Sequence, residues 1–384
     1  MNEAPGEFTQ ALRLSYRWHV AGAAGNKQPT CGVCGGIVHG EPPPHMNAHF
    51  PLLKISALLL ALCTLPSHAE EKPKPPATKP PTETELRAVI SKGLGFLAKD
   101  GEAWMKSKDC NGCHHMPEML WSHREAKLRG FEIDQKKFDG WLAWADGHAK
   151  DKKPGLEMMA LMKLALPERP SPELTKLIVA DQRADGSWKP AGQFADMQKR
   201  GAADAQANAT RVFLLALGTQ PSVPEVDAAR AKAAALLAKK DAPTSMESLV
   251  FRALYARSSG RQEDADALRA EILKQQRGDG GWSSFLGENM SDALATGEVL
   301  YALQPSSADA RTAEAIARAQ QWLVKTQRED GSWAVDITHI SKMDRSAPAK
   351  VKSFKDATMI YAYFGSGWAT IGLLQGVPVK AGEK

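Results

Sequence analysis

The segment around Cys110 carries the residue types and the spacing needed for covalent cofactor chemistry. The chain has five cysteines, and two of them, Cys110 and Cys113, are separated by two residues and followed directly by His114. In a Cys-x-x-Cys-His segment the two thiols can bond to the vinyl groups of a haem, and the adjacent histidine can ligate its iron. The pattern therefore predicts one covalent haem c held by Cys110, Cys113 and His114.

Two other chemistries are open to the same cysteine pair. An oxidising compartment would permit a surface disulfide, and a redox-active dithiol or metal site is the third possibility. The sixth iron ligand is open as well, and the iron could equally be five-coordinate. His115 and Met116 lie too close to His114 in sequence to reach the opposite haem face easily. Each candidate is weak alone, because methionine and histidine on helices usually belong to core or surface: Met119, Met158, Met159, Met162, His115, His123 and His148.

The segment 46–69 has the order of a secretory signal peptide. Lys54 supplies the basic flank, residues 55–62 form an apolar core, and Ser67-His68-Ala69 offers small residues at a cleavage site. The core is too short to span a bilayer, and a lipoprotein signal at Cys63 is the rival interpretation. We therefore expect a periplasmic or secreted protein, which agrees with haem attachment outside the cytoplasm.

A signal peptide that begins at an internal methionine suggests that translation starts at Met46. We expect residues 1–45 to be a wrongly chosen, disordered start, so that Cys31 and Cys34 have no role. If that segment is real, the pair is half a zinc site without its partner half. The stretch 70–83, rich in proline and lysine, is expected to be an extended linker.

A seven-residue sequence recurs three times and indicates how the chain would position the Cys-x-x-Cys-His motif. Each copy fixes Gln, Arg, Asp-Gly and Trp, and an aliphatic residue stands four positions before each Gln, which is helical spacing. Asp-Gly would end that helix in a tight turn, and Trp would lock the turn against a neighbour. We expect these residues to be structural staples. The copies are Gln182–Trp188, Gln276–Trp282 and Gln327–Trp333.

This repeated sequence resembles the QW repeat of the terpenoid cyclase and protein prenyltransferase superfamily, which includes squalene cyclase-like proteins. The resemblance covers about Pro172 to Leu374 and implies an all-α α/α toroid with an apolar central cavity. Helical patterns make about six outer–inner hairpins over residues 84–378, with a short tail at 379–384. The expected pairs are 86–98 with 117–128, 131–148 with 156–166, 172–181 with 204–217, 224–240 with 245–257, 262–275 with 291–303, and 311–326 with 354–374.

The repeat register predicts where the haem motif lies. In the first hairpin, Cys110–His114 takes the slot that a QW turn fills elsewhere, so the motif would lead into an inner helix near the rim of the cavity. In the fourth hairpin the QW turn is lost, and Lys239-Lys240-Asp241 stands in its place. We therefore expect the haem to be part of the toroid and not an appended cytochrome domain.

The catalytic residues of the resembling enzymes are missing. No Asp-x-Asp-Asp acid is present; Asp264-Ala265-Asp266 lies on an expected outer helix as a solvated face, and no third cysteine remains for a prenyltransferase-type zinc site. The net charge of +5 is scattered, which argues against nucleic-acid binding. Three acids are expected to begin inner helices as N-caps, with a ligand contact at the cavity mouth as the alternative: Asp204, Asp292 and Asp356.

These observations predict an exported toroid with one haem c that works in electron transfer or in redox chemistry on an apolar, isoprenoid-like ligand, with a redox partner. Two other classes stay open. One is a haem-free binding or scaffold protein with a degenerate cyclase fold. The other is a cyclase-like lyase or isomerase whose acids are unidentified.

Overall fold

The computed structural model describes residues 79–107, 115–148, 155–169, 171–190, 199–238, 243–303, 309–340 and 351–380, all within one compact unit. Within these ranges the regular structure is helical, and the only β-type pairing is two isolated bridges, Ser245 with Phe285 and Trp282 with Asp292. In the same part of the chain no helix combines the length and apolarity needed to cross a membrane. The prediction of an all-α chain is confirmed.

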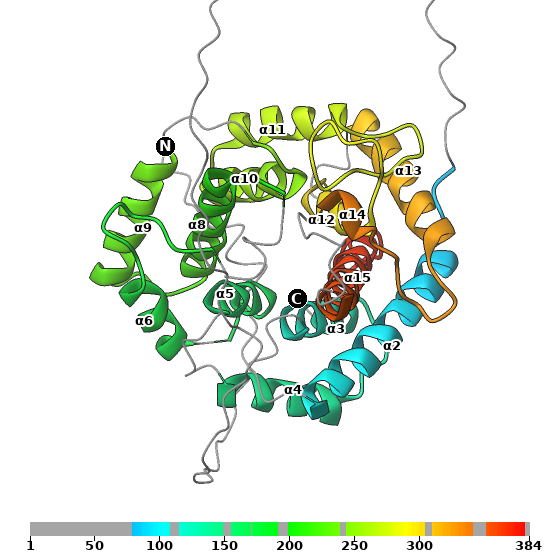
Figure 1. Ribbon diagram of the computed structural model, residues 1–384, viewed down its shortest axis with the longest axis horizontal. Helices are drawn as coiled ribbons and strands as arrows, with labels where there is room; N and C mark the ends of the chain where they lie inside the picture. The colour runs from blue at the N-terminus through cyan, green and yellow to red at the C-terminus, as the bar shows by residue number, and fades with distance from the viewer. Residues whose placement is uncertain are drawn as a thin grey trace, which may run out of the picture. The chain divides into compact units, whose positions relative to one another are not determined.

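Two concentric rings of helices form the unit (Figure 1). Each inner helix contacts the next one, and the last returns to the first, so the inner ring closes. The outer ring comprises α2 (Glu83–Ser107), α4 (Gln135–His148), α6 (Pro172–Ala180), α9 (Pro224–Leu237), α11 (Gln262–Lys274) and α13 (Ala310–Thr326). The inner ring comprises α3 (Met116–Leu128), α5 (Leu156–Ala165), α8 (Ala202–Gly218), α10 (Met246–Ser258), α12 (Ala293–Leu303) and α15 (Val351–Leu374).

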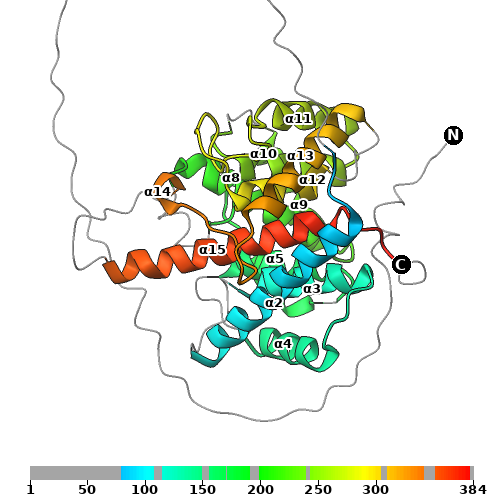
Figure 2. The same cartoon turned by 90° about the vertical axis from the view of Figure 1, so that its right-hand side faces the viewer.

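This arrangement confirms the α/α toroid and the pairing of the six hairpins. The expected bounds agree to within a few residues, except that α2 continues to Ser107. The first turns of α15 project beyond the ends of the neighbouring helices (Figure 2). A short helix, α14 (Ile337–Ile340), precedes that projection and contacts α15.

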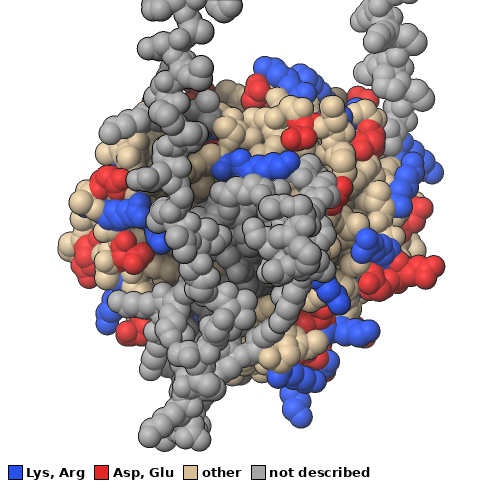
Figure 3. All heavy atoms as spheres, viewed as in Figure 1, with Lys and Arg blue, Asp and Glu red and all other residues tan. Residues whose placement is uncertain are grey.

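The inner and outer helices differ in how much of their surface is buried. Inner helices such as α3 and α12 are buried on nearly every face, whereas the outer helices bury one stripe and expose charged side chains. Figure 3 shows Lys, Arg, Asp and Glu interspersed over the visible outer helices, with no basic stripe there. Helices α12 and α15 approach closely, because a Cβ on Gly297 would lie 2.2 Å from the Trp368 carbonyl carbon.

In each of the three QW turns, the Trp side chain donates a hydrogen bond back to the preceding outer helix. At Trp282 the indole ring is fully buried, and its N–H donates to the Ile272 carbonyl at 2.8 Å. Ile272 is the aliphatic residue four positions before Gln276 that marked the repeat in the sequence. The same bond joins Trp188 to Ile178 at 2.7 Å and Trp333 to Leu323 at 2.9 Å.

The glutamine of each turn fastens one hairpin to the next. Gln276 donates to the Gly280 carbonyl within its turn (2.9 Å) and to the Ala315 carbonyl of α13 (2.7 Å). Gly280 has φ +100°, and a Cβ there would lie 2.7 Å from the Arg318 carbonyl oxygen, so glycine is required on both counts. The other two turns repeat this: Gln182 bonds to Ala229 of α9 (2.8 Å), and Gln327 bonds to Val89 of α2 (2.9 Å).

The bond from Gln327 joins the sixth hairpin to the first and thereby closes the outer ring. The expectation that the QW residues are staples is confirmed. The connections in the first and fourth hairpins, which include Cys110–His114 and Lys239-Lys240-Asp241, lie outside the described residues.

Candidate functional site

The predicted haem ligands Cys110, Cys113 and His114 lie in the stretch 108–114, outside the described residues. Their flanks are described: outer helix α2 ends at Ser107, and inner helix α3 begins at Met116. The motif therefore belongs to an outer-to-inner connection, the same place in a hairpin that the QW turns occupy. The roles of the three residues stay predictions.

His115, directly after the motif, is buried in an aromatic contact. Its ring stacks on Trp104 with centroids 4.6 Å apart and lies 4.0 Å from the ring of Tyr363 on α15. Its Nε2 is 3.2 Å from an Asp100 carboxylate oxygen, and its Nδ1 has no partner among the described residues. Burial lowers the pKa of His115, and the contact with Asp100 opposes that shift.

The other candidate iron ligands are mostly core residues. The Nδ1 of His123 lies 2.7 Å from the Met119 carbonyl oxygen, and burial lowers the pKa of His123 to about 4. His148 is the last residue of α4. The described part of the chain contains no group of three or more His, Cys, Asp or Glu side chains that could hold a metal ion. The remaining candidates are buried in the apolar core: Met119, Met158, Met159 and Met162.

A group of buried charges gathers at the N-terminal end of the inner ring. Arg200, just before α8, pairs with Glu247 of α10. Burial disfavours the charged form of Arg200, but Glu247, Glu157 of α5 and Asp204 of α8 outweigh that effect and raise its pKa. Glu157, Asp204 and Glu247 all lie in the first turn of an inner helix, where the helix dipole favours a carboxylate.

Two further carboxyls of this group are deeply buried. Glu118, in the first turn of α3, is 3% exposed, and burial raises its pKa to about 8. Glu298 of α12 is also 3% exposed, and burial, reinforced by Glu247 and Asp292, raises its pKa well above the ordinary value. The Glu118 carboxyl is therefore protonated at neutral pH, and burial favours the protonated form of Glu298 as well. We name Glu118, Glu157, Asp204, Glu247 and Glu298 the acidic cluster; each belongs to a different inner helix.

Several polar atoms in and beside this cluster have no partner among the described residues. One Asp204 oxygen accepts hydrogen bonds from Thr244 (2.8 Å) and Ser245 (2.9 Å), but the other accepts none. Asn208, one helical turn later on the same face of α8, is fully buried, and neither of its amide atoms is bonded. An Oε2 atom of Glu118 is unpartnered too. Buried polar groups are normally hydrogen-bonded, so these atoms require an explanation.

An aromatic cluster, Trp121, Phe251, Tyr301 and Trp368, lies one turn further along four inner helices. The ring centroids of Trp121 lie 5.3 Å from those of both Tyr301 and Trp368, and Phe251 is 6.4 Å from Trp368. These rings follow Glu118, Glu247 and Glu298 by three or four residues. Because rings from α3, α10, α12 and α15 touch one another, they meet inside the inner ring next to the acidic cluster.

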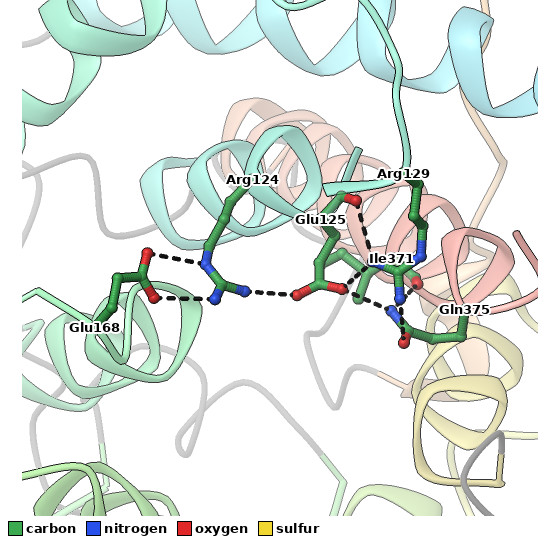
Figure 4. A network of polar contacts seen from close by, with 6 residues as sticks. All are labelled: Arg124, Glu125, Arg129, Glu168, Ile371 and Gln375. Atoms are coloured by element: carbon green, nitrogen blue, oxygen red, sulfur yellow. Dashed lines mark hydrogen bonds and ion pairs between the residues drawn. The ribbon is translucent and has the colours of Figure 1, made fainter. Parts of the chain in front are cut away.

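The next level along α3 is charged again, but each charged side chain there has a partner of opposite charge (Figure 4). Arg124 bonds to Glu168 (3.0 Å) and to Glu125 (2.8 Å), and Glu125 also accepts from Arg129 (2.5 Å). Arg129 in turn donates to Gln375, just beyond α15, at 2.9 Å. This network connects α3 to Glu168 and to Gln375.

The structure tests the N-cap role expected for the three helix-start acids. Asp292 caps α12, since its carboxylate accepts from the Ala295 amide at 2.8 Å. Asp204 caps nothing and joins α8 to α10 instead. Asp356 does not begin a helix, because α15 starts at Val351. The outer-helix acids Asp264 and Asp266 are solvated, as expected.

Sequence reasoning missed Glu118, Glu298 and Asn208. A signal was present, because each interrupts an inner-helix stretch of apolar or small residues, as in Ala295-Thr296-Gly297-Glu298-Val299-Leu300. A charged residue in such a stretch has to be buried with its neighbours. The described inner face is therefore apolar only in part, and the acidic cluster occupies one end of it.

Comparisons with known proteins support the fold and do not go beyond it. No family model matches the chain, and a search of curated proteins finds no match. Among solved structures, a possible member of the GH105 family from Salmonella enterica is 14% identical, covers 80% of this chain and 98% of its own, and superposes with a TM-score of 0.50. A type II terpene cyclase from Scytonema, solved with geranylgeranyl dihydroxybenzoate, is 13% identical, covers 77% and 98%, and has a TM-score of 0.50.

Proposed function

We propose that this chain is an exported toroid protein that carries one haem c, bound through Cys110 and Cys113 and ligated by His114, and that it transfers electrons. The observation that carries the proposal is the complete Cys-x-x-Cys-His motif on the connection from α2 to α3. Two thiols and an adjacent imidazole are the donor set that covalent haem attachment requires. The segment 46–69 would direct the chain to the compartment where attachment occurs.

The described flank of the motif fits a haem as a neighbour. Trp104, Met116 and Tyr363 place flat and apolar side chains around His115, and the unpartnered Nδ1 of His115 leaves a donor or acceptor for a polar group nearby. When bound, the haem would supply one-electron redox chemistry. The protein would hold its ligand set rigid by anchoring both ends of the connection, in α2 and in the buried start of α3.

The proposed ligand of the toroid is apolar and isoprenoid-like, and it would lie against the aromatic cluster. The terpene cyclase that shares the fold was solved with a geranylgeranyl compound, which makes this ligand class the natural first test. A redox partner outside the ring would exchange electrons with the haem near the α2–α3 connection.

Export of the protein in a host with haem-attachment machinery tests the proposal. We expect a coloured protein that keeps its haem after denaturation and gel electrophoresis. Cys113→Ser should lose one thioether and shift the reduced α-band, while His114→Ala should empty or exchange the axial position. A colourless protein with a Cys110–Cys113 disulfide would contradict the proposal and leave a haem-free binding protein.

A further inference from the structure

We propose that the N-terminal end of the inner ring binds an organic ammonium ion, which Glu118, Asp204 and Asn208 hold beside the aromatic cluster. The acidic cluster and the aromatic cluster are both built from described residues and share three helices, α3, α10 and α12. The inference goes beyond the haem proposal and does not depend on it, because none of these residues belongs to the Cys-x-x-Cys-His motif.

The first argument is charge. The acidic cluster supplies one carboxyl group from each of five inner helices. Glu247, Glu157 and Asp204 act on the charge of Arg200, and Glu247 and Glu118 act on the carboxyl of Glu298. Arg200 is already paired with Glu247. A cation placed beside Glu118 and Asp204 would stabilise the ionised forms of their carboxyl groups.

The second argument is hydrogen bonding. The acceptors without partners in the described part of the chain include a carboxyl oxygen of Glu118, a carboxylate oxygen of Asp204 and the amide oxygen of Asn208. An ammonium group offers several N–H donors and would satisfy such acceptors together. Two donors, Asn208 Nδ2 and Arg200 Nε, are also unpartnered, which suits a ligand that carries an oxygen besides its ammonium group.

The third argument is the neighbouring aromatic surface. Trp121, Tyr301 and Trp368 lie one turn from the acids, and aromatic rings attract cations at their faces and pack against apolar carbon.

A binding comparison between two matched probes tests the proposal. Benzylammonium and benzyl alcohol have nearly the same shape, but only the first is charged. By calorimetric titration of the full chain at pH 7, we expect benzylammonium to bind at least about tenfold more tightly, which corresponds to one well-placed charge interaction. Binding should release protons, seen as a heat that depends on the buffer, because the cation draws the protonated Glu118 carboxyl into its ionised form. Equal affinities, or no binding of benzylammonium at millimolar concentration, would overturn the proposal.

Variants then locate the site. Glu118→Gln and Asn208→Leu should each weaken benzylammonium binding roughly tenfold, and Glu118→Gln should also reduce the proton release. Glu173→Gln, the same change on the exposed face of outer helix α6, should leave binding unchanged. Thermal melting of each variant shows whether it is folded, and Asn208→Leu should melt no lower than the parent. Wild-type binding by both inner-ring variants, or equal weakening by Glu173→Gln, would overturn the assignment.

Discussion

The QW turns and the N-terminal end of the inner ring differ in whether their polar side chains are hydrogen-bonded. In the turn at Trp282, the Trp and Gln side chains both donate hydrogen bonds to backbone carbonyls, and the Asp279 carboxylate accepts from the Gly281 amide. In the inner ring, Asn208 is as deeply buried but has no partner among the described residues, and Glu118 leaves an oxygen unpaired. The polar side chains of the turn are hydrogen-bonded, whereas the inner-ring group keeps unpartnered atoms that the proposed ammonium ion would satisfy.

This difference separates stability from function within one repeat architecture. A satisfied polar group stabilises the fold, and its loss should be measured as a loss of unfolding free energy. An unsatisfied buried polar group destabilises the fold, and under the proposal a bound ligand would offset that cost. The following changes should therefore have different signs in the two regions.

The largest effect should come from Trp282→Ala. Removing a fully buried indole and its hydrogen bond to Ile272 should lower the free energy of unfolding by about 3–5 kcal/mol, measured by denaturant titration. Trp322→Ala, at a partly exposed position on outer helix α13, should cost clearly less. Unchanged melting together with lost activity would instead make Trp282 a ligand contact.

Gly280→Ala should cost about 2–3 kcal/mol, because φ of +100° strains any residue with a Cβ. The new Cβ would also lie 2.7 Å from the Arg318 carbonyl oxygen, so α13 would have to shift. Gly278→Ala in the same turn is the matched control, since a Cβ there meets nothing within 4 Å. Equal melting temperatures for the two variants would show that the turn does not fix the spacing of the hairpins.

The two regions should also respond oppositely to pH. Burial raises the pKa of Glu118 to about 8, so the folded state holds a proton that the unfolded state releases above about pH 4.5. Unfolding free energy should therefore fall as pH rises from about 4.5 through about 8, by up to about 1.4 kcal/mol per pH unit. The pKa of Asp330 in a QW turn is lowered by hydrogen bonds from Ser332, so its contribution is lost only as pH falls below the ordinary aspartate range.

Glu118→Gln isolates the inner-ring part of this pH dependence. The variant should flatten the decline between pH 5 and pH 8, although Glu298 still contributes a decline of the same sign. Denaturant titrations at several pH values measure it. An unchanged slope would mean that the Glu118 carboxyl is already ionised in the folded protein.

The smallest expected effects, which best distinguish the two regions, are the changes in unfolding free energy caused by Asn208→Leu and by Gln276→Leu. The first change removes an amide with no partner and should raise the unfolding free energy by about 1–2 kcal/mol. The second removes two hydrogen bonds, to Gly280 and to Ala315, and should lower it by a similar amount. Effects of the same sign would erase the contrast between the two regions.

The scaffold could be predicted from the sequence because the residues of the repeat determine local structure: helical spacing, a turn and a buried aromatic ring. The spacing from Ile272 to Gln276 and the Asp-Gly turn predicted the helix ends, and Trp282 was correctly expected to be a staple. The acidic cluster could not be predicted in the same way. Glu118 and Glu298 are far apart in sequence, and only closure of the inner ring brings the charge of Glu118 to bear on the Glu298 carboxyl. The start of α15 was also predicted too late, because the polar residues before Phe354 carry no apolar pattern.

The most direct test of the account is the intact mass of the mature, exported protein. The account predicts a chain that begins at Glu70 and is heavier than its polypeptide by one haem, with the addition lost when Cys110 and Cys113 are both replaced by serine. A mature protein that retains Cys31, or one with the bare polypeptide mass less the two hydrogens of a disulfide, would contradict it.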